Sequence, residues 1–260
     1  MIYKGKTAVV TGASSGIGLD YAREFAKRGA NLVLVARRVD LLKQAASELS
    51  QRHGVKVDTI ALDLSTLDAG QNLLDALGKL GVETDILVNN AGFGTSGRLK
   101  DENRERVQQE VVLNVATLVD LTTAVLPSLL AKNSGAIINI ASTAAFQPVP
   151  GMAVYAATKA FVLSFTSAVW GEIAGSGVRV LAVCPGATAT EFFDVAGAKP
   201  FGGLAPVSAV IDATFKALDA KKSRPVVVVG RQNALMAGVS KRLPQKAVIK
   251  AAGSMFLPKL

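Results

Sequence analysis

Short apolar runs alternate along this chain with segments of helical periodicity, and this alternation limits the folds that the chain can adopt. The runs are rich in β-branched residues and end at glycine or polar residues, as buried strands do. Strands this apolar need cover on both faces, which parallel strands obtain from their connecting helices. The pattern predicts an α/β fold with a doubly wound parallel sheet of about seven strands. The expected strands cover residues 7–12, 31–37, 56–63, 85–92, 136–142, 178–186 and 224–230, and the expected helices cover 19–29, 39–54, 107–135 and 153–175.

The length and composition are those of one domain. The 260 residues are 50% hydrophobic, and we find no internal repeat and no linker-like change in composition. The single cysteine, Cys184, excludes an intramolecular disulfide and fits a reducing compartment. The first ten residues lack the apolar region of a signal peptide. We therefore expect a cytoplasmic protein.

A glycine-rich turn joins the first expected strand to the first expected helix. It reads TGASSGIG over residues 11–18. Glycine permits a tight turn and close approach of the backbone to a pyrophosphate, and the helix that follows offers free N–H groups. An ordinary turn is the alternative, but the strand before the loop and the helix after it are what dinucleotide binding requires. The expected contacts in this Rossmann-type loop are Gly12, Ser14, Ser15, Gly16, Ile17 and Gly18.

The end of the second expected strand predicts which dinucleotide binds. An NAD-specific protein places a carboxylate there for the ribose 2′-hydroxyl. This chain has Arg37 and Arg38 instead, with no carboxylate before Asp40. Because a guanidinium can bind a 2′-phosphate through paired hydrogen bonds, we predict NADP(H), with Arg37 as the main contact and Arg38 as the secondary one. The alternative is that both arginines are solvated charges at a helix start.

Tyr155 and Lys159 stand one helical turn apart, so they share a face of the expected helix. A phenol with a pKa near ~10 exchanges protons poorly at neutral pH, and a neighbouring ammonium is expected to lower that pKa. Reducing a ketone needs a hydride on carbon and a proton on oxygen, and the tyrosine can supply the proton. Ser142, thirteen residues before Tyr155, could hold and polarise the substrate oxygen. Any amphipathic helix can carry a tyrosine and a lysine at this spacing, so the pair gains meaning only with the other motifs.

These motifs together resemble the classical short-chain dehydrogenase/reductase family. The glycine loop has that family's T-G-x-x-x-G-x-G spacing, and Ser142, Tyr155 and Lys159 match its serine and its Tyr-x-x-x-Lys. The resemblance covers roughly residues 5–230. It implies that Asn114 is a fourth catalytic residue, holding a water that relays protons to the lysine. It also implies that the lysine holds the nicotinamide ribose.

The resemblance implies further cofactor contacts at the carboxyl ends of the strands. Asp63 corresponds to the residue that binds the adenine amino group, and the NNAG segment at 89–92 to the one that packs beside the adenosine. A Pro-Gly pair and a nearby threonine line the nicotinamide. The implied contacts are Asp63, Leu64, Asn90, Ala91, Gly92, Tyr155, Lys159, Pro185, Gly186, Thr188 and Thr190.

The combined prediction is an NADP(H)-dependent oxidoreductase that interconverts a carbonyl and a secondary alcohol, with Tyr155 as acid and base. Residues 1–230 are expected to form the cofactor-binding and catalytic domain, and 231–260 a basic, apolar extension of it. One alternative is a dehydratase or epimerase on the same scaffold, which the short length and apolar lid disfavour. Another is a non-catalytic cofactor-sensing or membrane-surface scaffold, which the intact catalytic residues disfavour. No metal site is expected.

Two segments, 143–153 and 189–206, are expected to close the substrate pocket. They are rich in apolar and aromatic residues and carry few charges, so we expect a lipophilic or aromatic carbonyl or alcohol. The alternative is that these side chains serve only packing. The candidate pocket residues are Phe146, Val149, Met152, Phe192 and Phe193, with Phe201 further along.

The net charge of +9 belongs to the C-terminal end of the chain. Residues 221–260 hold nine basic and no acidic residues, and the other 220 residues carry 20 basic and 20 acidic groups. Residues 236–260 mix these charges with apolar residues, which is consistent with a subunit interface of a homodimer or homotetramer, or with peripheral contact to an anionic membrane. Nucleic acid is not an expected partner, because no recognition module accompanies the charge.

Overall fold

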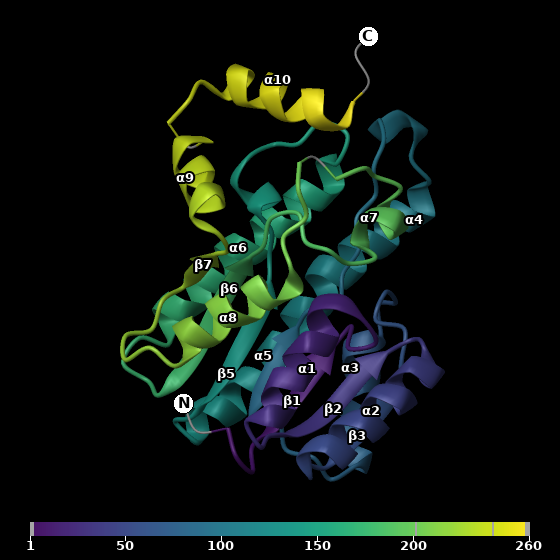
Figure 1. The fold of residues 1–260 in the computed structure, drawn as a ribbon, viewed down its shortest axis with the longest axis vertical. Helices are drawn as coiled ribbons and strands as arrows, with labels where there is room; N and C mark the ends of the chain where they lie inside the picture. The colour runs from purple at the N-terminus through teal and green to yellow at the C-terminus, as the bar shows by residue number, and fades with distance from the viewer. Residues whose placement is uncertain (1–2, 201, 241, 258–260) are drawn as a thin grey trace.

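A parallel sheet with helices on both faces forms the centre of the molecule (Figure 1). The computed structural model describes residues 3–200, 202–240 and 242–257. In these residues, seven strands lie in the order β3-β2-β1-β4-β5-β6-β7, which confirms the expected doubly wound fold. The strands are β1 Thr7–Thr11, β2 Asn31–Ala36, β3 Val57–Ala61, β4 Ile86–Asn89, β5 Gly135–Ile140, β6 Val178–Cys184 and β7 Val226–Val228.

The helices differ from the sequence-based expectation in several places, since the expected helices include none of α3, α7, α8, α9 and α10. The expected helix 107–135 is divided by a π-helix, Val112–Ala116. The α-helices are α1 Gly16–Lys27, α2 Val39–His53, α3 Ala69–Lys79, α4 Arg104–Val111, α5 Thr117–Ala131, α6 Ala153–Glu172, α7 Phe192–Ala196, α8 Val207–Leu218, α9 Arg231–Ser240 and α10 Gln245–Phe256.

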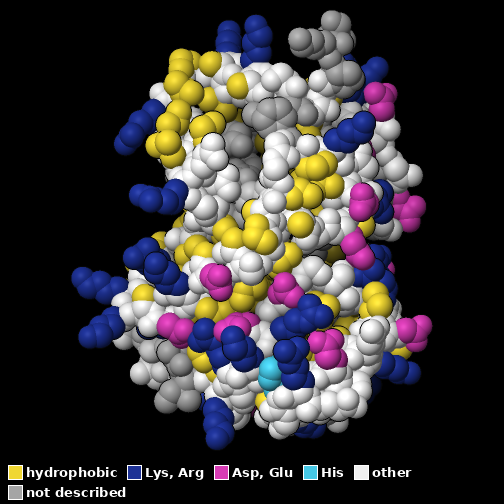
Figure 2. Space-filling model, viewed as in Figure 1, with side chains coloured by type: hydrophobic (Ala, Val, Ile, Leu, Met, Phe, Trp, Pro, Cys, Tyr) yellow, Lys and Arg dark blue, Asp and Glu magenta, His cyan; other side chains and the backbone are white. Residues whose placement is uncertain are grey.

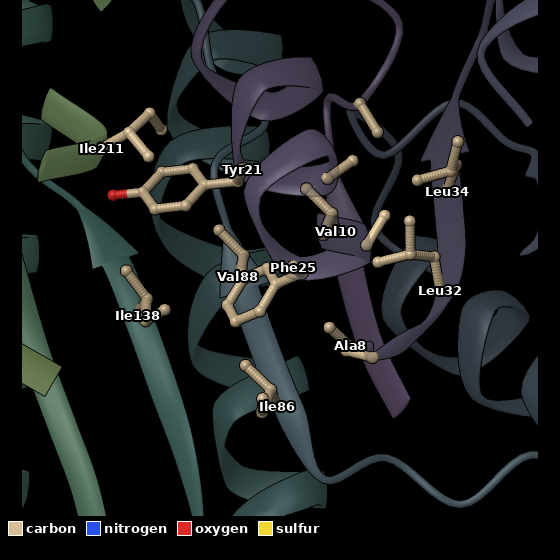
Figure 3. Packing of buried hydrophobic residues seen from close by; sticks show 14 of the residues in the cluster. Ala8, Val10, Tyr21, Phe25, Leu32, Leu34, Ile86, Val88, Ile138 and Ile211 are labelled. Carbon is tan, nitrogen blue, oxygen red and sulfur yellow. The ribbon is translucent and has the colours of Figure 1, made fainter. Parts of the chain in front are cut away.

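One face of the sheet packs against α1, α2 and α8. Tyr21 and Phe25 of α1 belong to one buried cluster with Val10 of β1 and Val88 of β4. Figure 3 shows the Tyr21 ring reaching toward Ile211 of α8. Both rings are fully buried, and the Tyr21 hydroxyl pairs with Thr214 Oγ1 of α8 at 2.6 Å. Burying aromatic rings of this size is among the largest single contributions to a core, so this layer fixes α1 on β1.

The other face packs against α3, α5 and α6. Side chains alternate along each strand, so Val9 of β1 faces this layer while Val10 faces the first one. Leu73 of α3 and Leu121 of α5 complete the contact. The helix stretches Arg104–Ala131 and Ala153–Glu172 are long and apolar enough, by length and composition alone, to span a membrane. Part of their apolar surface belongs to this core.

The strand order places a ligand crevice at one edge of the sheet. Strand β1 lies between β2 and β4. The chain therefore leaves β1 toward one face and β4 toward the other, and the loops after these strands separate at the carboxyl edge. Open α/β sheets bind ligands at this reversal, and the predicted site residues follow β1, β4, β5 and β6.

Candidate active site

Tyr155 and Lys159 of α6 face the carboxyl end of β5. Lys159 is 5% exposed, and its Nζ donates a hydrogen bond to the Ile140 carbonyl at 2.8 Å. The same nitrogen lies 5.8 Å from the centroid of the Tyr155 ring. Ser142 follows β5, and its hydroxyl is within hydrogen-bonding reach of the Tyr155 phenol. Three of the four predicted catalytic side chains therefore meet at one place.

Burial controls the protonation of this pair. It raises the pKa of Tyr155 to about 12, although the Ser142 hydroxyl lowers it in part. It lowers the pKa of Lys159 to about 8. From the sequence we expected the ammonium to lower the pKa of the phenol. In the structure the pKa of the phenol is raised instead. The reason is that desolvation of the phenolate dominates while the ammonium is directed at the Ile140 carbonyl.

Asn114 lies in the π-helix that interrupts the expected helix. It is 1% exposed. Its Nδ2 donates to the Phe93 carbonyl at 2.9 Å and to Thr158 Oγ1 at 3.1 Å, and its Oδ1 accepts from the Phe93 N–H at 3.2 Å. Such single π turns often occur at functional sites. Here the turn directs the amide toward α6 and the loop after β4.

The loop after β4 lies directly against the predicted catalytic side chains. A Cβ at Gly92 would lie 2.8 Å from Asn114 Oδ1 and 3.4 Å from Lys159 Nζ. A Cβ at Gly94 would lie 3.0 Å from the Tyr155 ring. The approaches of 2.8 Å and 3.0 Å would require Asn114 or the Tyr155 ring to shift, so the glycines let the loop pack onto α6.

The glycine loop after β1 forms a tight cradle before α1. Gly12 has φ +66°, in the left-handed region. A Cβ at Gly18 would overlap the Gly12 carbonyl oxygen. Asn90 Nδ2 donates to the carbonyl of Thr11 at 2.9 Å and to that of Gly12 at 3.3 Å, which ties the loop to β4. Ser15 is the N-cap residue of α1 and makes no side-chain cap hydrogen bond. The N–H groups of the first turn are therefore free to bind an anion.

Arg38 and Arg37 make different contacts. The Arg38 guanidinium donates to Ser14 Oγ at 3.0 Å and to Ser15 Oγ at 2.6 Å, and it pairs with Glu191 at 3.0 Å. The Arg37 side chain is 70% exposed, and its nearest partner, Asp63, is 3.9 Å away. Arg38 thus links the end of β2 to the glycine loop, while Arg37 remains open to solvent.

The other predicted cofactor contacts lie along the same edge. Asp63 accepts hydrogen bonds from Ser65, and the Leu64 carbonyl accepts one from Thr117. After β6, the Pro185 carbonyl accepts from the Thr143 N–H at 2.8 Å, and Thr188 Oγ1 donates to the Gly186 carbonyl at 3.0 Å. Among these positions, Thr190 packs near Gly16, Asn90 bonds the Gly12 carbonyl, and the Ala91 N–H donates to Thr11 Oγ1 at 3.0 Å. Gly92 continues toward Lys159, and Ile17 packs into the first core.

Most of the predicted pocket residues gather around Tyr155. Val149 and Met152 form a buried cluster against which Tyr155 and Phe192 pack. The Phe192 and Tyr155 ring centroids are 5.0 Å apart, and Phe193 meets Phe192 edge to face at 5.4 Å. Phe146 instead packs with Ala141, Val162 and Cys184, and Phe201 lies outside the described residues.

Three residues at the site were not predicted from the sequence. Phe256 of α10 packs against the Val149 and Met152 cluster, so the end of α10 lies at the site. Glu191 accepts from the Ser15 hydroxyl at 3.0 Å. Glu110 of α4 is fully buried. Its position four residues before Asn114 is the one signal in the sequence that could have pointed to it.

Comparison with known proteins finds a family and several relatives for this chain. The short chain dehydrogenase family model matches residues 6–200. Sulfoacetaldehyde reductase 2 of Chromohalobacter salexigens is 41% identical over 186 residues, which cover 71% of this chain and 73% of that protein. The NADP-dependent 3-hydroxy acid dehydrogenase of Schizosaccharomyces pombe is 37% identical over 190 residues, covering 72% and 73% of the two chains.

Solved structures match nearly the whole chain. A short-chain dehydrogenase from Sphingobium yanoikuyae in complex with NADPH has a TM-score of 0.80 and 35% identity, covering 92% of this chain and 97% of that one. A 7β-hydroxysteroid dehydrogenase has a TM-score of 0.85 and 26% identity, covering 96% and 97%.

Proposed function

The chain belongs to the short-chain dehydrogenase family, and we propose that it interconverts lipophilic carbonyl compounds and secondary alcohols, with Tyr155 as the acid and base. Its relatives make it an NADP-dependent oxidoreductase of carbonyl and alcohol groups. The observation that carries the proposal is the meeting of the Tyr155 phenol, the Ser142 hydroxyl and the Lys159 ammonium at the carboxyl edge of β5.

The glycine loop fits NADP(H). Gly12 and Gly18 leave no room for side chains where the backbone turns, and the first turn of α1 has no side-chain cap. Arg37 and Arg38 offer two guanidinium groups at the end of β2, where a 2′-phosphate would need a cation. We propose that Ser14, Ser15 and the first turn of α1 hold the pyrophosphate and that the two arginines hold the 2′-phosphate.

In the proposed mechanism, two side chains act on the carbonyl oxygen and a third acts on the phenol. Bound NADPH supplies the hydride that adds to the carbonyl carbon. The Ser142 hydroxyl donates a hydrogen bond to the oxygen, and the Tyr155 phenol gives it a proton. The Lys159 ammonium, with its positive charge, stabilises the phenolate that results. Asn114 would hold the water through which Lys159 exchanges protons with solvent.

The protonation states favour carbonyl reduction at neutral pH. Because burial raises the pKa of Tyr155 to about 12, the phenol keeps the proton that reduction requires. Alcohol oxidation needs the phenolate and therefore gains from rising pH. Lys159, with a pKa of about 8, loses its charge first. The rate of reduction is thus expected to fall on the alkaline side as Lys159 deprotonates.

The walls around Tyr155 favour a lipophilic substrate. Val149, Met152, Phe192 and Phe256 present apolar surface next to the phenol. One relative carries a name for a small anionic aldehyde and one structural neighbour a name for a steroid. The relatives alone therefore leave the substrate class open, and the apolar walls decide the proposal in favour of a steroid-like or aromatic carbonyl.

The proposed function is tested by NADPH oxidation with a panel of carbonyl compounds. Steroidal and aromatic ketones are expected to be reduced more efficiently than sulfoacetaldehyde or short aliphatic aldehydes. Binding of NADPH is measured separately by fluorescence. Preference for the short or anionic aldehydes would overturn the lipophilic assignment, and tight NADPH binding without turnover across the panel would overturn the proposed reaction.

Substitution of the two arginines tests the cofactor contacts. Arg37→Asp is expected to raise the ratio of NADH to NADPH efficiency by about tenfold or more, because a carboxylate repels the 2′-phosphate. Arg38→Ala is expected to weaken both cofactors, because Arg38 also holds Ser14 and Ser15. The measurement is kcat/KM for each cofactor. An unchanged ratio in Arg37→Asp would reject Arg37 as the main 2′-phosphate contact.

The C-terminal residues 231–260 are proposed to extend the same domain and to bind an anionic membrane surface. They pack onto it through Asn233, whose side chain donates to the Val229 carbonyl at 2.7 Å, and through Phe256. Leu235 and Met236 of α9 are 67% and 59% exposed. Figure 2 shows apolar side chains beside Lys and Arg near this end of the molecule. No acidic residue follows Asp219, so the charge complements an anionic surface.

Vesicle co-sedimentation tests this surface. We expect binding to phosphatidylserine vesicles and not to phosphatidylcholine vesicles, with loss of binding in Met236→Asp. Binding to neither vesicle, together with a dimer or tetramer that Met236→Asp dissociates, would replace the membrane with a second copy of this chain.

A further inference from the structure

A buried carboxyl group lies next to the active site and has no part in the mechanism above. Glu110 of α4 is 0% exposed. Both of its carboxylate oxygens are buried, and within the described ranges neither has a well-formed hydrogen bond. The N–H and hydroxyl of Thr95 lie close enough to lower the carboxyl pKa in part. Burying a carboxylate without full hydrogen bonding lowers the free energy of unfolding. A role in the active site would explain why a carboxyl stands at this position.

Glu110 and Asn114 hold the same loop at two successive places. The two residues are four positions apart, on one side of the helical stretch that runs through α4 and the π-helix. Asn114 binds both backbone groups of Phe93, and Glu110 lies at Thr95. Gly94, between these contacts, lies against the Tyr155 ring. The carboxyl is therefore one residue removed from the wall of the catalytic site.

Two charged groups on neighbouring elements act on this carboxyl. Burial raises the pKa of Glu110 to about 7, Glu102 after the short 3₁₀ turn raises it further, and Lys159 of α6 lowers it. The charge of Glu110 in turn raises the pKa of both Lys159 and Tyr155. Arg106, one turn earlier on α4, is occupied elsewhere, since it stacks on Phe93 and donates to the Val195 carbonyl at 3.0 Å.

We propose that Glu110 is a positioning residue whose buried carboxylate keeps the Lys159 ammonium charged while the enzyme works. The inference rests on the proposed function, because Lys159 matters only if its charge supports proton transfer by Tyr155. The carboxylate acts through space and does not touch the substrate.

The direction of the effect follows from the charges. Burial disfavours the ammonium and lowers the pKa of Lys159 to about 8, and a carboxylate nearby opposes that shift. Glu110 is ionised above about pH 7, which is where Lys159 would otherwise begin to lose its proton. Without the carboxylate, the pKa values of Lys159 and Tyr155 both fall. The alkaline limb of carbonyl reduction then moves to lower pH.

The variant Glu110→Gln tests this role, because it keeps the shape and removes the charge. We expect the alkaline limb of the kcat/KM profile to move down by about one pH unit, with little change at the acid side. The pH dependence of NADPH binding is expected to shift in the same direction. Glu105→Gln is the matched control, since Glu105 is an exposed carboxylate on the same helix, and its profiles are expected to coincide with those of the unchanged protein.

Infrared spectroscopy of the protein without cofactor tests the protonation of Glu110 directly. Infrared difference spectra of the free protein between about pH 5 and about pH 9 are expected to contain a protonated buried carboxyl that titrates near neutrality and is absent from Glu110→Gln. Thermal stability gives the folding check. A carboxyl whose pKa is raised in the folded state contributes to the free energy of unfolding below its unfolded pKa, and this contribution is lost as pH rises through about 7. The free energy of unfolding of Glu110→Gln should lack this loss between acid and neutral pH.

The possible outcomes separate the inference from the proposed function. Superimposable pH profiles for Glu110→Gln and the unchanged protein, or an equal shift in Glu105→Gln, would overturn the inference. If Glu110→Gln did not fold, Glu110→Met, which also removes the charge at similar volume, must give the same shift. Failure of the unchanged protein to turn over any carbonyl would overturn the proposed function instead, and the shift in NADPH binding would still test Glu110.

Discussion

Tyr155→Phe is expected to reduce carbonyl turnover by about 10²- to 10⁴-fold while leaving NADPH binding nearly unchanged. The substitution removes one oxygen atom, the one that lies within reach of the Ser142 hydroxyl. The ring keeps its packing against Phe192, whose centroid is 5.0 Å away, and against Gly94. The loss should therefore appear in kcat, because the missing group acts only when the carbonyl oxygen takes up its proton.

Tyr21→Phe is the matched control for this experiment. Tyr21 is also fully buried, but it lies in the core under α1, where its hydroxyl pairs with Thr214. Its replacement is expected to lower the free energy of unfolding by about 1 kcal/mol and to leave turnover intact. Turnover is measured as NADPH oxidation with the best ketone of the panel. If Tyr155→Phe kept more than about a tenth of the activity, Tyr155 could not be the main proton donor.

The fold was predictable from sequence where local patterns are strong. Each expected strand is short, β-branched and apolar, and the seven strands of the structure fall within the expected ranges except that β5 begins one residue earlier, at Gly135. Helices α3 and α8 were not predicted. Helix α3 contains Gly70 and Gly78, which weaken its helical pattern. Helix α8 follows a segment that we assigned to the pocket lid, and its inner face is set by contact with α1.

The site was predictable in its order along the chain and not in its energetics. The spacing of Ser142, Tyr155 and Lys159 places the serine after β5 and the other two on α6, and the structure brings them together. The direction of the Tyr155 pKa shift was wrong, because it depends on burial by groups far apart in sequence. Phe256 and Glu110 could not be assigned from local patterns, since each reaches the site through tertiary packing.

Gly18→Ala is expected to weaken NADPH binding by a factor of about one hundred or more and to lower stability. The added methyl would overlap the Gly12 carbonyl oxygen and lie 2.5 Å from Asn90 Nδ2. Both are parts of the loop, and neither can move without breaking the hydrogen bonds that tie Asn90 to Thr11 and Gly12. The turn must therefore open, and the N–H groups of the first turn of α1 no longer point at the pyrophosphate. Their hydrogen bonds to it contribute several kcal/mol to binding.

Gly171→Ala separates this local clash from the general effect of adding a methyl group to a helix. Gly171 is exposed near the end of α6, and a Cβ there meets nothing within 4 Å. This control is expected to leave NADPH binding unchanged and to raise the free energy of unfolding by about 0.5–1 kcal/mol, because alanine favours the helix. Calorimetric NADPH titration and thermal unfolding measure the two effects. Equal NADPH affinity in Gly18→Ala and Gly171→Ala would mean that the glycine loop does not hold the pyrophosphate, since the same methyl group would then be harmless at the tightest point of the cradle.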